Sequence, residues 1–304
     1  MTLAIILLVA MILDALLGEP DWLWSRLPHP AVLIGRAIGW LDQRFNRGSA
    51  RKARGVATFA ALCLAALAYG VLIAAVPGGW IIEVILTAIL LAQRSLVDHV
   101  RAVACALRLS TGDGRLAVAQ IVGRDTTGMD QPAIARAAIE SAAENLSDGV
   151  IAPAFWFLVA GLPGLLLYKV TNTADSMIGY RTDRHRDFGW AAARFDDLLN
   201  WFPARLTAAL IAVTHGKWDE HPLIRRDARL HRSPNAGWPE AAMAVVLNIA
   251  LAGPRSYGGI KQDFPFVHPE GRRAATADDI DAAVTALWRT WAGTVAIVML
   301  IAVV

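Results

Sequence analysis

Carboxylate side chains recur at every fourth residue in the segment "IESAAENLSDGVIAP", residues 139–153. Glu140, Glu144 and Asp148 would lie on one face of a helix, because four residues make slightly more than one helical turn. Like charges at this spacing repel one another, so the arrangement calls for a compensating cation. A Mg²⁺ or ammonium site is one interpretation. A solvated acidic face, with Arg136 paired to one carboxylate, is the alternative.

A second polar cluster, "YKVTNTADSMIGYRTDRHRDFG", occupies residues 168–189 and follows an apolar segment directly. Asn172 and Asp175 are three residues apart and therefore share a helix face. The arginines that follow would suit phosphate groups, which guanidinium binds through paired hydrogen bonds. They would equally suit an anchor at a membrane surface, and the whole cluster also fits a polar helix end.

A third cluster, "AARFDDLLNWFPARLTA", places Asp196 and Asp197 side by side ahead of an apolar segment, with Arg194 and Arg205 on either side. Adjacent aspartates with an oxygen ligand one turn later are typical of magnesium sites that hold polyphosphates. The favourable position of carboxylates at a helix N-terminus is the alternative explanation.

A fourth stretch, "HRSPNAGWPEAAMAVVL", places Ser233 and Asn235 in a turn before a helix that carries Glu240. Turn chemistry alone explains the residues around Pro234. The sequence contains no G-x-x-x-x-G-K-[ST] segment, so a bound nucleotide would be held by something other than a P-loop.

The composition indicates that these residues are positioned by a membrane protein. The 304-residue chain is 56% hydrophobic and only 18% charged, whereas soluble domains carry about 25% charged residues. Its net charge of +3 comes without a dense basic run, which excludes a nucleic-acid partner. The two cysteines show no C-x-x-C spacing, so we expect neither a disulfide nor a zinc site.

Apolar segments recur along the chain, and only residues 56–76 form a charge-free span of full bilayer length. Asp14, Glu83 and Arg205 interrupt other segments, which predicts that those helices face a protein interior or a wet cavity. The sequence "GLPG" at Gly161 predicts a broken or re-entrant helix. The apolar segments cover about residues 2–18, 56–76, 80–93, 150–171, 198–214, 237–252 and 286–304.

Positive charge gathers in three stretches, residues 26–54, 94–149 and 215–235, which predicts that these loops are cytoplasmic. We therefore expect an all-α polytopic membrane protein with about five to seven membrane segments, one of them broken near 150–171. Its cytoplasmic loops should be helical, and the whole chain, residues 1–304, should form a single domain.

Taken together, the motifs resemble the CbiB/CobD family, the adenosylcobinamide-phosphate synthases of cobalamin (vitamin B12) biosynthesis. "HPAVLIGRAIGWLD", "IVGRDTTGMD", "IESAAENLSDGVIAP", "YKVTNTADSMIGY", "FGWAAARFDDLLNWFPARLTA" and "SPNAGWPEAAMA" occur in family order over residues 14–260. The chain departs from the family near its C-terminus. There Ala252 replaces the first glycine of the usual G-G-P-x-x-Y-x-G stretch, and the Lys-Pro pair that usually follows is not clearly preserved.

The resemblance implies an ATP-dependent carbon–nitrogen ligase with Mg²⁺ as cofactor and ATP as co-substrate. It would join the propionate carboxylate of adenosylcobyric acid to the amine of (R)-1-aminopropan-2-ol or its O-phosphate. The protein would be a multi-pass protein of the cytoplasmic (inner) membrane, in contact with the lipid bilayer, and its active site would face the cytoplasm. Association into a homo-oligomer or with late corrinoid-pathway enzymes stays open.

The clusters supply candidate residues for this chemistry. Metal ligands are expected among Glu140, Glu144, Asp175, Asp196 and Asp197. Contacts to substrate or phosphate are expected from Arg124, Arg194, Arg205, Ser233 and Asn235. The catalytic group is expected among Glu140, Glu144, Asn145, Asp148, Lys169, Asn172 and Asp175.

Three other functions compete with the ligase. Charged residues in broken apolar helices would also suit a transporter, although the polar clusters gather at segment ends and no inverted repeat is visible. "SDGVIAP" is similar to the D-G-x-x-A of CDP-alcohol phosphotransferases but lacks the rest of that motif. A non-catalytic scaffold for corrinoid enzymes would leave the many placed carboxylates unexplained.

Overall fold

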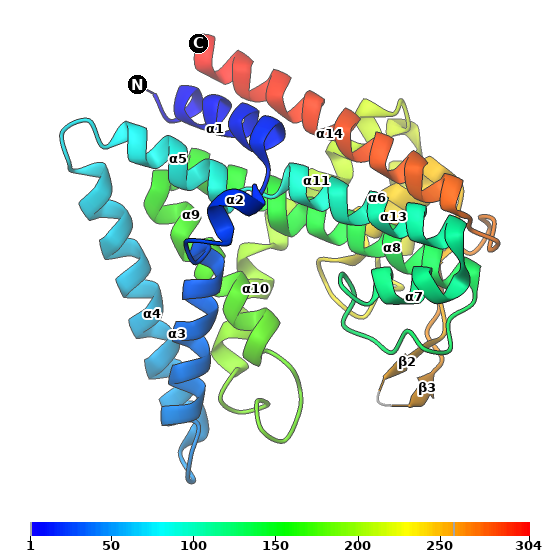
Figure 1. The fold of residues 1–304 in the computed structure, drawn as a ribbon, viewed down its shortest axis with the longest axis horizontal. Helices are drawn as coiled ribbons and strands as arrows, with labels where there is room; N and C mark the ends of the chain where they lie inside the picture. Colours follow the sequence, from blue (N-terminus) through cyan, green and yellow to red (C-terminus); the bar gives the residue numbers. More distant parts are fainter. Residues whose placement is uncertain (1, 258) are drawn as a thin grey trace. The chain divides into compact units, whose positions relative to one another are not determined.

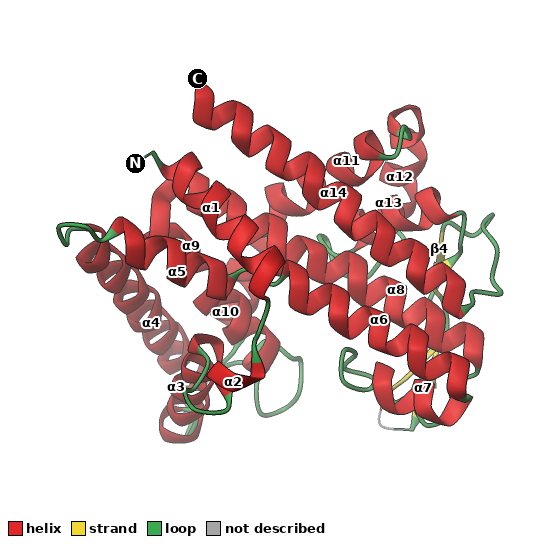
Figure 2. Cartoon of the chain, turned by 45° about the horizontal axis from the view of Figure 1, so that its top comes forward, coloured by secondary structure: helices red, strands yellow, loops and turns green. Residues whose placement is uncertain are grey.

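The computed structural model of the chain describes residues 2–257 and 259–304, except the side chains of residues 21, 257 and 261. It is helical almost throughout, with two short two-stranded antiparallel sheets, β1–β4 and β2–β3 (Figures 1 and 2). The all-α polytopic prediction is confirmed, since four helices among the described residues are long and apolar enough to cross a membrane. These four are Arg51–Ala74, Trp80–Leu109, Gln131–Ile178 and Ala277–Val303, and shorter apolar helices cover Leu3–Leu17 and Trp201–Thr214.

The chain forms two compact units, each built from segments that alternate along the sequence. Because neither unit is a continuous stretch, the expectation of a single sequence domain stays a prediction. Unit 1 comprises the chain up to Ala92, Ala152–Asn200 and Val298–Val304. Its helices are α1 (Leu3–Leu17), α2 (Asp21–Trp24), α3 (Pro30–Phe45), α4 (Arg51–Ala74), α5 (Trp80–Leu90), α9 (Ala152–Ile178) and α10 (Trp190–Leu199).

Unit 2 comprises Gln93–Ile151 and Trp201–Ile297. The last helix, α14 (Ala277–Val303), contributes its residues up to Ile297 to this unit. The other helices of unit 2 are α6 (Gln93–Leu109), α7 (Thr111–Val118), α8 (Gln131–Leu146), η1 (Ser147–Ile151), α11 (Trp201–Thr214), η2 (Trp218–Glu220), α12 (His221–Ala228) and α13 (Gly237–Leu247). Its strands are β1 (Leu251–Ala252), β2 (Arg255–Tyr257), β3 (Ile260–Gln262) and β4 (Phe266–Val267).

Helix α9 is the centre of unit 1, where it packs against α3, α4 and α10. The predicted break is confirmed: Ala160 and Gly161 leave the helical conformation, and Gly161 has φ 63°, which glycine adopts without steric cost. Pro163, two residues after Gly161, lies against α4. A β-carbon added at Gly70 of α4 would come within 2.6 Å of the Pro163 Cα atom, so the two helices meet backbone to backbone.

The acidic residues that interrupt the apolar helices of unit 1 are buried, as predicted. Asp14 in α1 and Glu83 in α5 are 4% and 7% exposed, and the two helices pack against each other. Both side chains therefore face the protein interior rather than the surroundings of the chain.

Helix α8 is the centre of unit 2 and packs on α6, α7 and α13 (Figure 1). Its small residues allow this close packing, since Ala135, Ala138 and Ala142 are fully buried. The three carboxylates do not lie on one uninterrupted α-helix. Helix α8 ends at Leu146, and Asp148 lies in the π-helical turn η1. The face that Asp148 would share with Glu140 and Glu144 stays a prediction.

Candidate functional site

Glu140 is the most enclosed carboxylate among the predicted site residues, and it is held by two arginines. Its Oε2 atom lies 2.8 Å from Nη2 of Arg124 and 3.1 Å from Nη2 of Arg255, while Oε1 accepts a hydrogen bond from the Ala252 backbone N–H at 2.8 Å. Both oxygens thus already have positively charged or amide donors. Its predicted role as a metal ligand stays a prediction, and the structure gives it different partners.

This ion pair forms one wall of a cavity of about 630 Å³ in unit 2. We call it the mixed-charge hollow, because Arg124, Arg136 and Arg255 line it together with Asp125 and Asp130. The β2–β3 hairpin is tied to this wall by a hydrogen bond from the Gly259 backbone N–H to Oδ2 of Asp125, 2.7 Å long. The hollow thus offers sites for both an anion and a cation.

A second cavity of unit 2, about 610 Å³ in volume, is strongly cationic. Among the described residues that line it there is no aspartate or glutamate, so we call it the arginine hollow. Its lining residues are Trp201, Arg205, Arg225, Ala228, Arg229, His231, Arg232, Ser233, Pro234 and Trp238.

Arg205 is positioned in the arginine hollow by two aromatic rings. Its guanidinium carbon lies 4.5 Å from the ring centre of Trp201 and 4.8 Å from that of Trp238, within the range of cation–π attraction. The guanidinium also donates to Oδ1 of Asn235 at 3.4 Å, and Ser233 Oγ accepts from the Asn235 backbone N–H at 3.3 Å. The predicted phosphate contacts Arg205, Ser233 and Asn235 are therefore brought together.

A small recess adjoins both cavities. His231 and Arg232 line the recess and the arginine hollow, whereas Ala252 and Arg255 line the recess and the mixed-charge hollow. The two cavities of unit 2 are therefore neighbours, separated by a few side chains.

One of these side chains, His231, forms a buried pair with Glu240. Nδ1 of His231 accepts a hydrogen bond from the Ser233 backbone N–H at 3.1 Å, so the ring proton is on Nε2, 3.5 Å from Oε1 of Glu240. Burial, with the nearby Glu140 and Glu144 carboxylates, raises the pKa of Glu240 well above its usual value. Burial and Arg255 lower the pKa of His231 to about 4. Burial therefore favours the neutral form of both groups.

Unit 1 brings the second and third sequence clusters together where α9 packs against α10. Asp196 Oδ2 accepts a hydrogen bond from Asn200 at 3.0 Å, Oδ1 accepts one from Asn172 at 3.5 Å, and Asn200 Oδ1 accepts one from the Tyr168 hydroxyl at 3.0 Å. Burial and the neighbouring Asp175 carboxylate raise the pKa of Asp196 to about 7. Both amides present N–H groups to Asp196, so only the carboxylate oxygens could bind Mg²⁺ here. Asp175, Asp196 and Asp197 do not come together as a three-ligand group among the described residues, and their role as metal ligands stays a prediction.

The other predicted residues have more ordinary surroundings. Glu144 and Asn145 are exposed on α8, and Asn145 donates to the Ser141 backbone carbonyl at 2.9 Å. Asp148 and Lys169 are half-buried. Arg194 and Asp197 form a pair of 3.5 Å on α10, with both side chains partly exposed.

The predicted site residues divide between the two units. Their combination into one active site stays a prediction. Unit 1 holds Lys169, Asn172, Asp175, Arg194, Asp196 and Asp197, and unit 2 holds Arg124, Glu140, Glu144, Asn145, Asp148, Arg205, Ser233 and Asn235.

Several residues around the cavities were not expected from the sequence. Arg255 belongs to the stretch that departs from the family pattern, and Arg232 and His231 lie in a turn explained by its turn chemistry. Glu240 alone carried a usable signal, because it is the one charged side chain in the helix Gly237–Leu247.

Comparison with known proteins decides the family. A profile described as "CobD/Cbib protein" matches residues 7–287, nearly the whole chain. The chain belongs to the CobD/CbiB family. The comparison with solved structures found no match.

Curated relatives in this family are similar to the chain over almost their full length. A protein of Rhizobium meliloti (strain 1021) is 52% identical over 301 residues, which cover 93% of this chain and 92% of the relative. A Sinorhizobium protein is 50% identical over 304 residues, 94% of each chain. One from Rhodobacter capsulatus is 45% identical over 317 residues, 100% of this chain and 98% of the relative. All three are called "Cobalamin biosynthesis protein CobD".

Proposed function

We propose that the chain is an adenosylcobinamide-phosphate synthase, an ATP- and Mg²⁺-dependent amide ligase of cobalamin biosynthesis. It would join the propionate carboxylate of adenosylcobyric acid to the amine of (R)-1-aminopropan-2-ol or its O-phosphate. Membership in the CobD/CbiB family and the names of the relatives support the pathway. The arginine hollow is the observation that best supports the specific proposal of a ligase that uses ATP and a phosphorylated substrate.

The phosphate-bearing reactants require a cationic site. ATP and aminopropanol phosphate both present phosphate oxygens, which guanidinium groups bind through charge-assisted, often paired hydrogen bonds. The arginine hollow offers Arg205, Arg225, Arg229 and Arg232, and its described lining contains no carboxylate that would repel an anion. Because its aromatic contacts hold Arg205 in place, less side-chain conformational freedom is lost when a phosphate binds.

The two groups to be joined carry opposite charges before reaction, and the mixed-charge hollow offers partners for both. Arg124, Arg136 and Arg255 would attract the propionate carboxylate, and Asp125 and Asp130 would attract the ammonium of aminopropanol. Holding the two reactants side by side is itself a large part of catalysis of a bimolecular reaction.

The reaction would follow two balanced steps. A carboxylate oxygen of the corrinoid attacks the γ-phosphorus of ATP, which forms an acyl phosphate and releases ADP. The ammonium then loses a proton to a carboxylate, for which Glu144 and Asp148 are the candidates. The free amine attacks the acyl carbon and the carbon–nitrogen bond forms. The bond from that carbon to the phosphate oxygen then breaks, and inorganic phosphate leaves with the second proton lost from the nitrogen.

Mg²⁺ would be held by Asp175, Asp196 and Asp197 in unit 1, whose oxygen donors suit this ion. When bound, it supplies a hard positive charge that stabilises phosphate oxygens. The protein would lie in the cytoplasmic membrane with the site facing the cytoplasm. Support comes from the arginine hollow, which includes residues of the positively charged stretch 215–235.

The test is an assay with the purified full-length chain in detergent. Mg-ATP, adenosylcobyric acid and aminopropanol phosphate are supplied, and the amide product and ADP are measured by mass spectrometry. We expect product only when all three are present, and none from Glu144→Gln, which should remain folded. Replacing Arg229 by Gln should raise KM for ATP by about 10-fold or more, since a hydrogen bond to a charged group contributes about 1.5–3 kcal/mol.

Arg94→Gln is the matched control, because Arg94 lines neither cavity and its half-exposed side chain lies 2.8 Å from Oδ2 of Asp98 on the same helix. It should leave KM unchanged. Product formed without ATP, or an unchanged KM in the Arg229 variant, would contradict the proposal. No product with the corrinoid still bound would favour a scaffold or a missing subunit, and no corrinoid binding would favour a transporter.

A further inference from the structure

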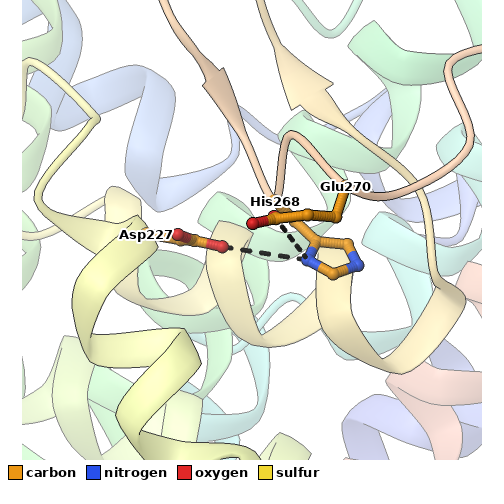
Figure 3. A group of neighbouring side chains, drawn as sticks. All are labelled: Asp227, His268 and Glu270. Atoms are coloured by element: carbon orange, nitrogen blue, oxygen red, sulfur yellow. Dashed lines mark ion pairs between the residues drawn. The ribbon is translucent and has the colours of Figure 1, made fainter.

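Unit 2 contains a second group of ligand-type side chains, none of which lines the mixed-charge or the arginine hollow. Asp227 comes from α12, and His268 and Glu270 come from the turn that follows β4 (Figure 3). One ligand atom from each residue lies within 4.8 Å of the other two. Asp227 is fully buried and His268 is 7% exposed, whereas the Glu270 side chain is 60% exposed.

The imidazole of His268 is oriented by Asn248, the residue that ends α13. Nε2 of His268 lies 3.2 Å from Oδ1 of Asn248, so Nε2 is the ring nitrogen that carries the proton. Nδ1 then presents its lone pair to Oδ2 of Asp227 at 3.8 Å and to Oε2 of Glu270 at 4.0 Å (Figure 3). A lone pair facing two carboxylates is the arrangement of a cation site.

Two atoms of this group lack hydrogen bonds despite being buried. Within the described part of the chain, neither Nδ1 of His268 nor Oδ2 of Asp227 has a hydrogen-bond partner. Buried polar atoms are nearly always satisfied, and leaving one unsatisfied costs about 1–3 kcal/mol. A cation between the two atoms would satisfy both at once.

The backbone at His268 supports the same interpretation. His268 has φ 55°, in the left-handed region that is uncommon for residues other than glycine. Such conformations persist where the surroundings hold them, and they gather at functional sites.

A purely structural ion-pair network explains the group less well. Arg226 donates from Nε to Oδ1 of Asp227 at 2.7 Å and from Nη2 to both oxygens of Glu270 at 2.9 and 3.1 Å. These bonds leave Oδ2 of Asp227 unsatisfied. A protonated His268 would not satisfy it either, because 3.8 Å is too long for a hydrogen bond.

We propose that Asp227, His268 and Glu270 bind a divalent transition-metal ion, Zn²⁺ in the first place, with an open coordination position toward solvent. One imidazole and two carboxylates suit Zn²⁺, whereas Mg²⁺ prefers oxygen ligands alone. Tetrahedral ligands about 2.0–2.2 Å from zinc lie about 3.4 Å apart. The separations of 3.8 Å to Asp227 and 4.0 Å to Glu270 would therefore each have to close by about half an ångström when the ion binds. The hydrogen bond from Nε2 to Asn248 is the outer contact that zinc-binding histidines usually have.

The site would fasten α12 to the turn after β4 and to the end of α13. Arg229 and Arg232, which follow α12 directly, line the arginine hollow, so the ion would also steady that wall. The proposal is independent of the ligase activity. It also differs from the magnesium set predicted from the sequence, in which none of these three residues appears.

The test uses the untagged full-length chain in detergent, in a Cys105→Ser background so that this exposed free thiol does not bind zinc. The protein is dialysed against a chelator and then exposed to Zn²⁺ in excess Mg²⁺. Metal content is measured by mass spectrometry, and affinity by competition with a chromophoric chelator. We expect one zinc per chain, lost in His268→Gln and weakened at least 10-fold in Glu270→Gln, whose position is exposed.

Two further variants separate metal binding from folding effects. Asn248→Gly should weaken zinc binding about 10- to 100-fold, since glycine accepts the left-handed backbone (φ 52°) and only the outer hydrogen bond is lost. Arg226→Gln should keep or strengthen zinc binding, because it removes a competing positive charge. His99→Gln, at an exposed histidine of α6, is the control and should change nothing. No zinc in the parent protein, or equal affinity in the parent, His268 and Glu270 variants, would overturn the proposal.

Discussion

Nη2 of Arg124 and Oε2 of Glu140 lie 2.8 Å apart, and both side chains are almost completely buried, at 7% and 6% exposure. The pair joins the loop before α8 to the middle of that helix, and Arg255 adds a second guanidinium to the same carboxylate. One glutamate therefore neutralises only one of two buried arginines, and the pair leaves a net positive charge beside the mixed-charge hollow.

Replacing Glu140 by Gln should destabilise the protein strongly, because Arg124 and Arg255 would lose their buried negative partner. Removing one member of a buried pair costs about 3–5 kcal/mol. This corresponds to a drop of roughly 6–20 °C in Tm for a chain of this size class. Thermal unfolding in detergent measures it. Glu144→Gln, on the same helix but exposed, should change Tm little, and equal losses in both variants would contradict the ion-pair argument.

Replacing Glu240 by Gln should have a different effect, because burial favours the protonated, neutral form of Glu240 in the folded protein. Folding raises the pKa of Glu240, so this carboxyl group stabilises the folded protein fully below its unfolded pKa of about 4.3. That contribution is lost as pH rises through the folded pKa. As pH rises above about 4.3, wild type should therefore lose up to about 1.4 kcal/mol per pH unit relative to the variant until the folded pKa is passed. His231 is present in both proteins, so the effect of its own lowered pKa cancels in this comparison.

Unfolding free energies of wild type and Glu240→Gln between pH 5 and pH 9 provide the measurement. Parallel curves over the whole range would mean that folding does not raise the pKa of Glu240, and the argument from its burial would then be wrong.

Mg²⁺ binding at Asp196 should depend on pH around 7. Below its pKa of about 7 the carboxyl group is protonated and competes with the metal, so affinity should rise up to 10-fold per pH unit from pH 6 to 7 and level off above. Without metal, the same raised pKa contributes stability that is lost as pH rises from about 4 through about 7. Calorimetry of Mg²⁺ binding at several pH values measures the first effect. Asp196→Asn should abolish it, whereas Asp219→Asn, at an exposed aspartate of unit 2, should not.

Replacing Gly70 by Ala should separate α4 from α9 in unit 1. The new β-carbon would lie 2.6 Å from Cα and 2.7 Å from N of Pro163, and backbone atoms cannot move aside as a flexible side chain can. Overpacking of this kind costs about 1–3 kcal/mol or more. Gly123→Ala is the control, since no atom lies within 4 Å of an added β-carbon there. A Tm for the Gly70 variant equal to that of the control would show that the helices are not in backbone contact.

Much of the fold was predictable because apolar length and helix breakers act locally. The broken helix follows from Gly161 and Pro163, and the burial of Asp14 and Glu83 follows from the cost of idle charge in apolar helices. The π-helical turn at Asp148 had no such signal, since it depends on how α8 is packed. Strands of two or three residues are too short for alternation to show in the sequence.

The site was only partly predictable, because the spacing of residues along the chain does not show which side chains from distant elements form ion pairs. Arg124 and Glu140 were both singled out, but for different roles, and 16 residues separate them along the chain. Arg255 reaches the same carboxylate from a hairpin more than a hundred residues away. The Asp227, His268 and Glu270 group was missed for the same reason, because its members come from separate elements and show no ligand spacing.

The two indole rings that flank Arg205 also give the arginine hollow an optical signal of its own. Indole fluorescence responds to nearby charge and water, so an anion that enters beside Arg205 should change the emission of Trp201 and Trp238. The chain has 11 tryptophans, and the difference between the parent protein and Trp238→Phe would isolate the relevant part of the signal. Occupancy of the hollow could then be followed in unlabelled protein, in real time and without any turnover.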